Sequence, residues 1–199
     1  MSKWIEISNS NEIEWGALSL LGASTKRSDD SKIGFFGSGN KFSLAKLFRD
    51  EVEFKIFSGE QEIPITIEKE QFKDKEFDVI YINGVKTSIT TEFGPKWEPW
   101  MVIREFYSNA IDEGNATIQK TNELNPVPGR TKIYIENIKG YLEVMTKFDQ
   151  YFSFNLEPAV ILSDKTKLFY NNNSDANFFR KGIRVFHYKM KSVFHYDFN

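Results

Sequence analysis

The segment from Glu98 to Glu113 constrains the fold more than any other part of the chain, because it is the clearest helix in the sequence. Its apolar side chains recur at helical spacing: Val102, Ile103, Phe106, Tyr107, Ala110 and Ile111. Pro99 fits the first turn of a helix, and Gly114 fits the position after the last turn. The pattern therefore predicts a helix with one apolar face.

The same helix carries a polar stripe made of Glu105, Asn109 and Asp112, at positions i, i+4 and i+7. Polar side chains beside a buried face are costly unless they reach solvent, find partners or line a site. A carboxylate can orient or deprotonate water, and an amide oxygen is a suitable ligand for Mg²⁺. Taken alone, the spacing favours an ordinary solvated helix face, so a second motif is needed to decide.

A glycine-rich turn supplies that second motif. Gly34, Gly37 and Gly39 precede Lys41, and an apolar-periodic stretch from Phe42 to Phe48 follows. The backbone amides of such a turn and the start of the following helix could hold phosphate, with the lysine as a positive charge. The turn has no P-loop ending and no βαβ unit around it, so neither a Walker site nor a dinucleotide fold is indicated. A tight structural turn is the alternative interpretation.

Most of the remaining periodic stretches predict strands. They are residues 4–7, 52–57, 62–67, 77–82, 85–91, 116–121, 131–136 and much of 168–199. Short helices are expected within 14–21 and 141–152, and the charged segment from Glu68 to Glu76 is expected to be a turn. We therefore expect an α+β fold with a mostly antiparallel sheet, in one domain that spans residues 1–199.

Composition excludes several classes of site. The chain has no cysteine and only two histidines, so thiolate chemistry and a histidine zinc site are not expected. The formal net charge of −2 gives no basic footprint for nucleic acid, which makes nucleic-acid binding an unlikely function. No apolar stretch is long enough to span a membrane, and the N-terminus lacks a signal core, so no membrane partner and a cytoplasmic location are expected.

Together, the two motifs resemble the GHKL (Bergerat-fold) ATPase family, which includes gyrase B, the ninety-kilodalton heat-shock chaperones, MutL, MORC proteins and histidine kinases. Glu105-Phe-Tyr-Ser-Asn109-Ala-Ile-Asp112 resembles the helical E-x-x-x-N-A-x-D box of that family, and the Gly34–Lys41 turn resembles the end of its glycine-rich lid. The segment Leu20–Arg27, with Ser24, Thr25 and Lys26, resembles the lid entry of MORC-like and chaperone-like members. The strand with Thr87 resembles the late strand whose threonine approaches adenine.

The order of these motifs is permuted. In the family the E-x-x-x-N helix comes first, whereas here it follows the threonine strand, as a circular permutation would produce. The resemblance covers about residues 4–121, and residues 122–199 are expected to add strands and a helix of unassigned role. It implies a two-layer α/β sandwich in which helices cover the sheet.

One family motif lacks its characteristic residues in this chain. The D-x-G-x-G adenine box should follow the first strand, where this chain has Ser8-Asn-Ser-Asn-Glu12. Replacement of the family's aspartate by Ser8 or Asn9 weakens adenine recognition or demands a water-mediated substitute. A plain polar turn is the alternative for this segment.

The resemblance implies a protein that binds ATP or ADP and Mg²⁺ and hydrolyses ATP slowly. Glu105 is the expected catalytic base and Asn109 the magnesium ligand, and the expected nucleotide-binding residues are Asn109, Asp112, Ser24, Thr25, Lys26, Gly34, Gly37, Gly39, Lys41 and Thr87. The alternative is a degenerate member of the fold that binds or inhibits a protein partner through its aromatic C-terminal third and has no ATPase activity.

Three smaller features are better explained by structural or solvent-exposed roles than by a binding site. Trp97 and Trp100 are expected in the core or as an interface anchor. The basic residues of segment 180–184, with Lys189 and Lys191, are expected on a solvated strand face, although they could meet phosphate or an acidic partner. His187 and His195 are expected to share a sheet face in a structural role.

Overall fold

The computed structural model describes residues 2–19, 33, 39–162, 165–172 and 174–198. The chain divides into two compact units, residues 1–142 and residues 143–199. The sequence pattern predicts one domain with a change of role after residue 121, whereas the structure places the division between residues 142 and 143. The reason is that β8 (Arg130–Glu136) pairs with both β1 and β2, so the first unit cannot end before it.

The first unit contains a five-stranded sheet in the order β3-β2-β8-β1-β7, in which all pairs are antiparallel. Its strands are β1 (Trp4–Ser10), β2 (Phe54–Ser58), β3 (Gln61–Glu62), β7 (Thr117–Thr121) and β8 (Arg130–Glu136). Strand β1 extends three residues beyond the expected segment 4–7. Its polar residues Ser8 and Asn9 are buried and stay in register with β8, which is why the strand continues through them.

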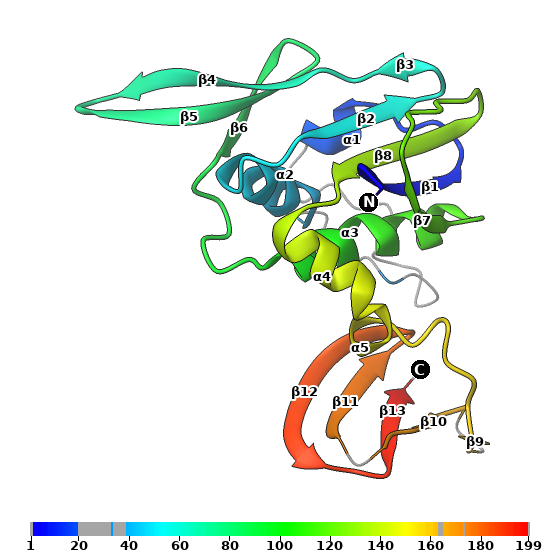
Figure 1. Ribbon diagram of the computed structural model, residues 1–199. Helices are drawn as coiled ribbons and strands as arrows, with labels where there is room; N and C mark the ends of the chain where they lie inside the picture. Colours follow the sequence, from blue (N-terminus) through cyan, green and yellow to red (C-terminus); the bar gives the residue numbers. More distant parts are fainter. Residues whose placement is uncertain (1, 20–32, 34–38, 163–164, 173, 199) are drawn as a thin grey trace. The chain divides into compact units, whose positions relative to one another are not determined.

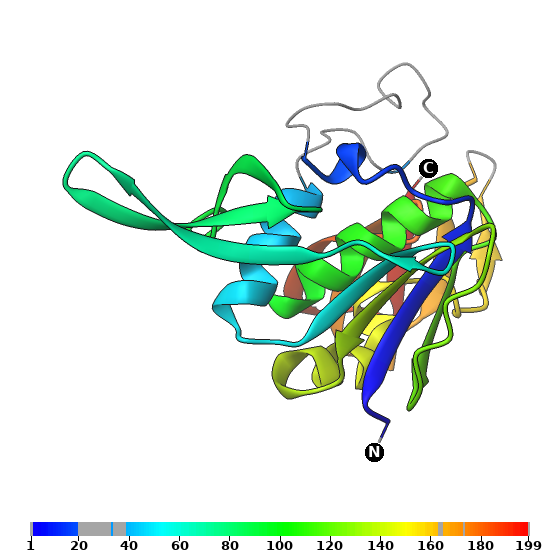
Figure 2. The same ribbon diagram turned by 90° about the horizontal axis from the view of Figure 1, so that it is seen from above.

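Helices cover one face of this sheet (Figures 1 and 2). They are α2 (Gly39–Arg49), α3 (Pro99–Glu113) and the first residues of α4 (Lys139–Thr146), and the short helix α1 (Gly16–Ser19) contacts α2. The predicted helix after the glycine turn and the predicted helix of residues 98–113 are both confirmed. Helix α3 begins at Pro99 and ends where Gly114 adopts φ of 99° and its amide donates to Ala110 and Ile111 carbonyls.

A three-stranded antiparallel sheet completes the first unit. It consists of β4 (Ile65–Phe72), β5 (Lys75–Ile82) and β6 (Val85–Thr90), in that order. The hairpin of β4 and β5 projects away from the helices (Figures 1 and 2). The expectation of a turn from Glu68 to Glu76 is wrong, because paired strands occupy most of that segment and the turn is confined to Lys73 and Asp74. Cross-strand charge pairs such as Lys69 with Glu76, at 2.7 Å, make a charged strand possible here.

The second unit contains a sheet in the order β12-β11-β13-β10-β9, with β12 at one edge (Figure 1). Its strands are β9 (Val160–Ile161), β10 (Lys167–Tyr170), β11 (Asp175–Arg180), β12 (Ile183–Lys191) and β13 (Phe194–Phe198). All pairs are antiparallel except β11 with β13. The short helix α5 (Phe148–Tyr151) precedes the sheet. The expected α+β class with mostly antiparallel sheets is confirmed.

Candidate functional site

Helix α3 presents two different faces to its surroundings. Val102, Ile103, Phe106 and Ala110 are buried, and β1 and β7 lie close to the helix. The polar stripe lies beside this apolar face and packs against the neighbouring helix α2 and the residues that precede it. The stripe is therefore not a solvated helix face.

The carboxylate of Glu105 lies directly against the backbone of Gly39, the first residue of α2. A Cβ atom at position 39 would overlap the carboxyl carbon and both carboxylate oxygens of Glu105. Only glycine leaves room for this approach. The carboxylate also lies at the N-terminal end of an eleven-residue helix, where the helix dipole favours negative charge.

The other two stripe residues bond to the same segment of the chain. The amide Nδ2 of Asn109 donates to Oδ1 of Asn40 at 2.8 Å. The backbone amide of Ile33 donates to Oδ1 of Asp112 at 2.8 Å, and Asp112 is buried. Two motifs that lie about 70 residues apart in the sequence thus meet, since the separations of these pairs are 69 and 79 residues. We refer to this meeting as the α2–α3 junction.

Two cations accompany Glu105 at the α2–α3 junction. The side chain of Lys41 is 1% exposed, and burial lowers its pKa while the negative charge of Glu105 partly restores it. The guanidinium of Arg104 lies 3.9 Å from a carboxylate oxygen of Glu105. Burial also lowers the pKa of Arg104, again opposed by Glu105, and an arginine stays protonated under such a shift. The junction therefore combines one carboxylate with two basic side chains.

The aromatic residues near the start of α3 hold Arg104 in place. Its guanidinium carbon lies 5.7 Å from the ring centre of Trp97 and 5.3 Å from that of Trp100. Trp97 also packs on Phe42 of α2, with ring centres 5.1 Å apart. Trp97 and Trp100 are expected in the core or as an interface anchor, whereas the structure shows both as half-buried side chains close to the Arg104 guanidinium. The sequence carries a signal for part of this arrangement, because Trp100 and Arg104 are i and i+4 on the predicted helix.

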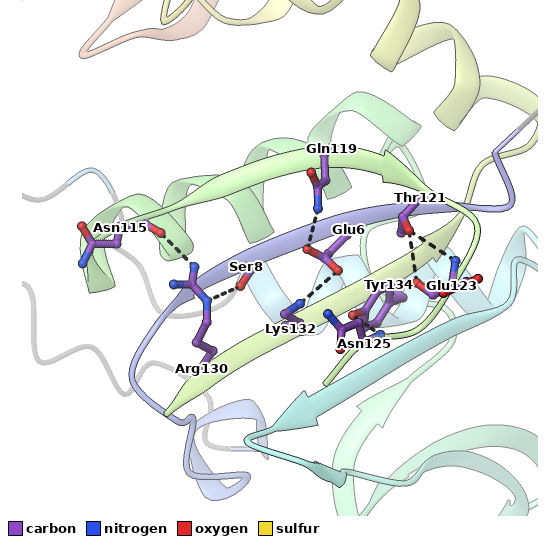
Figure 3. A network of polar contacts seen from close by, with 10 residues as sticks. All are labelled: Glu6, Ser8, Asn115, Gln119, Thr121, Glu123, Asn125, Arg130, Lys132 and Tyr134. Atoms are coloured by element: carbon purple, nitrogen blue, oxygen red, sulfur yellow. Dashed lines mark hydrogen bonds and ion pairs between the residues drawn. The ribbon is translucent and has the colours of Figure 1, made fainter. Parts of the chain in front are cut away.

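Ser8 and Asn9, the two candidates for the position of the family's adenine-binding aspartate, lie near the end of β1 and on opposite faces of the sheet. Side chains alternate across a strand, so Ile5, Ile7 and Asn9 share the face toward α3, and Ser8 lies on the other face. On that other face the hydroxyl of Ser8 accepts a hydrogen bond from Nε of Arg130 at 2.9 Å (Figure 3). Ser8 is therefore part of a polar network on the far side of the sheet, and Asn9 is the residue on the side of the α2–α3 junction.

The network around Ser8 has a structural role. Glu6 accepts from Gln119 at 3.0 Å and forms a buried ion pair with Lys132 at 3.3 Å (Figure 3). These residues lie on three neighbouring strands, β7, β1 and β8, so they satisfy one another across the sheet. The hydroxyl of Tyr134 accepts from the amide of Asn125, and burial raises the pKa of Tyr134. This face is held together by its own partners.

Thr87 lies in β6, within the three-stranded sheet. Its hydroxyl donates to the carbonyl of Ile80 at 2.6 Å and accepts from the amide of Ile89 at 3.1 Å. Both bonds are internal to the β5–β6 hairpin. Thr87 also lines a hollow of about 320 Å³, together with Phe72, Phe77 and Val79 among others.

Five expected nucleotide-binding residues lie outside the described residues: Ser24, Thr25, Lys26, Gly34 and Gly37. Of the remaining expected residues, the structure brings Glu105, Asn109, Asp112, Gly39 and Lys41 together. Thr87 is placed in the adjoining small sheet.

Asn109 is the residue of the α2–α3 junction whose side chain could coordinate a magnesium ion. Within the described parts of the chain, no group of three or more His, Asp or Glu side chains forms a metal cage. Mg²⁺ commonly binds through one or two protein oxygens and keeps waters and phosphate oxygens as its other ligands. Since Nδ2 of Asn109 donates to Asn40, its Oδ1 is the amide atom suited to such a metal.

Of the helices that the structure describes, none combines the length and the apolar character of a membrane span.

Comparisons with known proteins give no assignment. No family model, no curated protein and no solved structure matches the chain.

Proposed function

We propose that the α2–α3 junction is a GHKL-type nucleotide site that binds Mg²⁺-ATP, or a related nucleotide, and hydrolyses it slowly. The observation that carries this proposal is that Glu105, Asn109 and Asp112 meet residues 33–41 through the contacts described above. A solvated helix face would not make these contacts. The two-layer arrangement of α2 and α3 on an antiparallel sheet supports the same fold type.

Each residue has a distinct chemical role in this proposal. Glu105 accepts a proton from the attacking water, and Lys41 and Arg104 balance its charge and the charge of the phosphates. Asn109 offers an amide oxygen to Mg²⁺, which neutralises phosphate charge when bound. The N-terminal end of α2 adds backbone amides for a phosphate oxygen.

Base recognition is the weak part of the site. Asn9 is buried on the junction side of β1 and has an amide where the family has an aspartate. An amide both donates and accepts, so it discriminates less between bases than a carboxylate does. This observation favours the second candidate function, a degenerate member of the fold that binds a protein partner without ATP hydrolysis.

Thermal unfolding tests the nucleotide site. Saturating Mg²⁺-ATP should raise the Tm of the protein by roughly 5 °C, because a ligand of the native state stabilises it. Asn109→Ala should abolish this shift while the apo protein stays folded, and Asn122→Ala, at an exposed asparagine, should keep it. The absence of any shift for the unaltered chain at millimolar nucleotide contradicts the proposal.

Phosphate release then separates the two candidate functions. Glu105→Gln should eliminate release and keep the Mg²⁺-ATP shift, whereas Glu113→Gln, at an exposed glutamate of the same helix, should behave as the unaltered chain. Binding without release in the unaltered chain would support the degenerate binding protein instead.

A further inference from the structure

The outer strand of the second unit, β12, has the features of a peptide-binding edge. It is nine residues long, lies at the edge of its sheet, and is exposed from Val185 to Lys191. An isolated bridge joins Ile183 to Phe152 at the start of β12, and beyond it β12 pairs only with β11 among the described strands. The backbone on the outer side of Val185 to Lys191 is therefore the part that another strand could use. An extended peptide can use such an edge by adding one strand to the sheet.

Apolar and basic side chains alternate from Phe186 to Lys191 of this strand. Phe186, Tyr188 and Met190 are 56%, 43% and 56% exposed, and Lys189 and Lys191 alternate with them. Successive side chains of a strand point to opposite faces. Register with β11 is regular from Phe186 to Tyr188, and an irregularity follows before Lys191.

The apolar face of this sheet continues beyond β12. Phe178 of β11 is paired with Phe186 on one side and with Tyr196 of β13 on the other. The ring centres of Phe178 and Tyr196 are 5.0 Å apart with nearly parallel planes, and Phe198 stacks on the same ring at 6.2 Å. An added strand would therefore rest its apolar side chains beside an existing aromatic surface.

Charge decides which partner fits this strand. Residues 175–199 contain five basic residues, Arg180, Lys181, Arg184, Lys189 and Lys191, against two acidic ones, Asp175 and Asp197. Asp197 is buried and accepts from Ser153, and Asp175 lies 3.4 Å from His187. The solvent side of β12 is thus basic.

The same charge makes a second copy of the chain a poor partner. Two β12 strands side by side would bring Lys189 and Lys191 of one copy near those of the other. Lysines on an exposed edge strand disfavour such self-pairing. A segment with acidic residues gains from the same lysines.

We propose that β12 binds an extended segment of a partner protein in which acidic and apolar residues alternate. The segment adds to the sheet as a sixth strand, its apolar residues on the face of Phe186 and its acidic residues toward Lys189 and Lys191. This surface is independent of nucleotide binding at the α2–α3 junction.

Fluorescence anisotropy with a labelled peptide tests the proposal in the full chain. A peptide of about eight residues in which glutamate and valine alternate should bind saturably, since a typical strand has that length. A peptide of the same composition, with all glutamates before all valines, should bind about tenfold more weakly, because it cannot match both faces of a strand. Equal binding of the two peptides would overturn strand addition and leave only charge attraction.

Reversing the charge of the two lysines on β12 is a second test of the proposal. The variant Lys189→Glu with Lys191→Glu should lose the glutamate–valine peptide and bind an alternating lysine–valine peptide instead. Lys75→Glu with Lys96→Glu, at two exposed lysines of the first unit, should behave as the unaltered chain. Loss of binding in this control, or unchanged binding in the β12 variant, would contradict the site.

Three further outcomes would each overturn the proposal. Displacement of the peptide by oligothymidine at lower concentration would assign the surface to single-stranded nucleic acid. A dimer in sedimentation equilibrium that the β12 variant dissociates would assign it to a second copy. Hydrogen exchange that shows no new protection of β12 amides with bound peptide would exclude backbone pairing. Asn109→Ala should leave peptide binding unchanged whether or not the nucleotide site proves real.

Discussion

The α2–α3 junction and the strand β12 depart in opposite ways from the usual distribution of side chains. At the junction, charged groups are buried: Lys41 is 1% exposed and Asp112 is nearly as enclosed. At β12, large apolar side chains are in solvent. Burying charge and exposing apolar surface both cost stability, so a sequence keeps such arrangements where they serve another purpose.

The two regions differ in how the local structure accommodates this cost. At the junction, every stripe residue has a partner, and Gly39 removes the one atom that would keep Glu105 away. At β12, the exposed rings of Phe186 and Tyr188 contact each other, with ring centres 6.0 Å apart, and remain open to solvent. The first region is preorganised within the chain, whereas the second is open to a partner.

The largest expected effect contrasts two phenylalanines of the second unit. Phe179 is fully buried, and Phe186 lies on the adjacent strand β12 with more than half of its surface exposed. Phe179→Ala should lower the free energy of unfolding by about 3–5 kcal/mol, because it leaves a cavity in a small core. Phe186→Ala should lower it by less than about 1 kcal/mol, the range of surface substitutions and weak ring contacts.

Urea titration of the two variants, followed by circular dichroism, measures this difference. Equal losses of stability would mean that the face of Phe186 is covered in the native protein. That result would remove the contrast between the two regions and the partner proposed for β12.

The next largest effect is expected from Gly39→Ala, which should lower the rate of phosphate release more than it lowers the Tm. The overlapping group in Gly39→Ala is the flexible end of the Glu105 side chain, which can move aside, so the Tm should change little. Displacement of the carboxylate should instead reduce phosphate release by about 100-fold, the usual cost of moving a catalytic group by an ångström.

Gly16→Ala is the matched control for this prediction. Gly16 lies in α1, and a Cβ there would have no neighbour within 4 Å, so activity should be unchanged. Release by Gly39→Ala at the rate of the unaltered chain would show that the close approach of Glu105 to Gly39 has no role in the reaction.

Parts of these two regions could be predicted from sequence for clear physical reasons. Helix α3 follows from its apolar spacing, its proline and its terminal glycine, which are all local signals. That α2 packs against α3 depends on contacts between segments about 70 residues apart, which periodicity does not encode. The expectation that the two motifs belong to one site came from the family resemblance.

Other features of the structure also have signals in the sequence. The alternation of Ile5, Ile7 and Asn9 continues the strand beyond residue 7 and assigns Asn9 to the buried face. The two units, by contrast, could not be separated from sequence, because β8 joins the first sheet between strands that lie far earlier in the chain. The alternation of apolar and basic residues in β12 is visible in the sequence, while its position at a sheet edge is not.

The smallest expected effect is a pH dependence that belongs to the second unit alone. Nδ1 of His195 accepts a hydrogen bond from the backbone amide of Asn177 at 3.0 Å, which requires the neutral ring. Burial, and to a lesser degree the nearby His187, lower the pKa of His195 below its ordinary value of 6.5. The folded state therefore binds fewer protons than the unfolded state, so this contribution to stability is complete above about pH 6.5 and is lost as the pH falls below it.

Hydrogen exchange of the Asn177 backbone amide measures this effect at the hydrogen bond itself, after the intrinsic exchange rate is corrected for pH. The protection factor of its amide should fall between pH 7 and pH 5 in the unaltered chain. In His195→Asn, whose amide oxygen can accept the same hydrogen bond without titrating, protection should stay constant over that range. The same loss of protection in both proteins would show that the imidazole of His195 is not the source of the pH dependence.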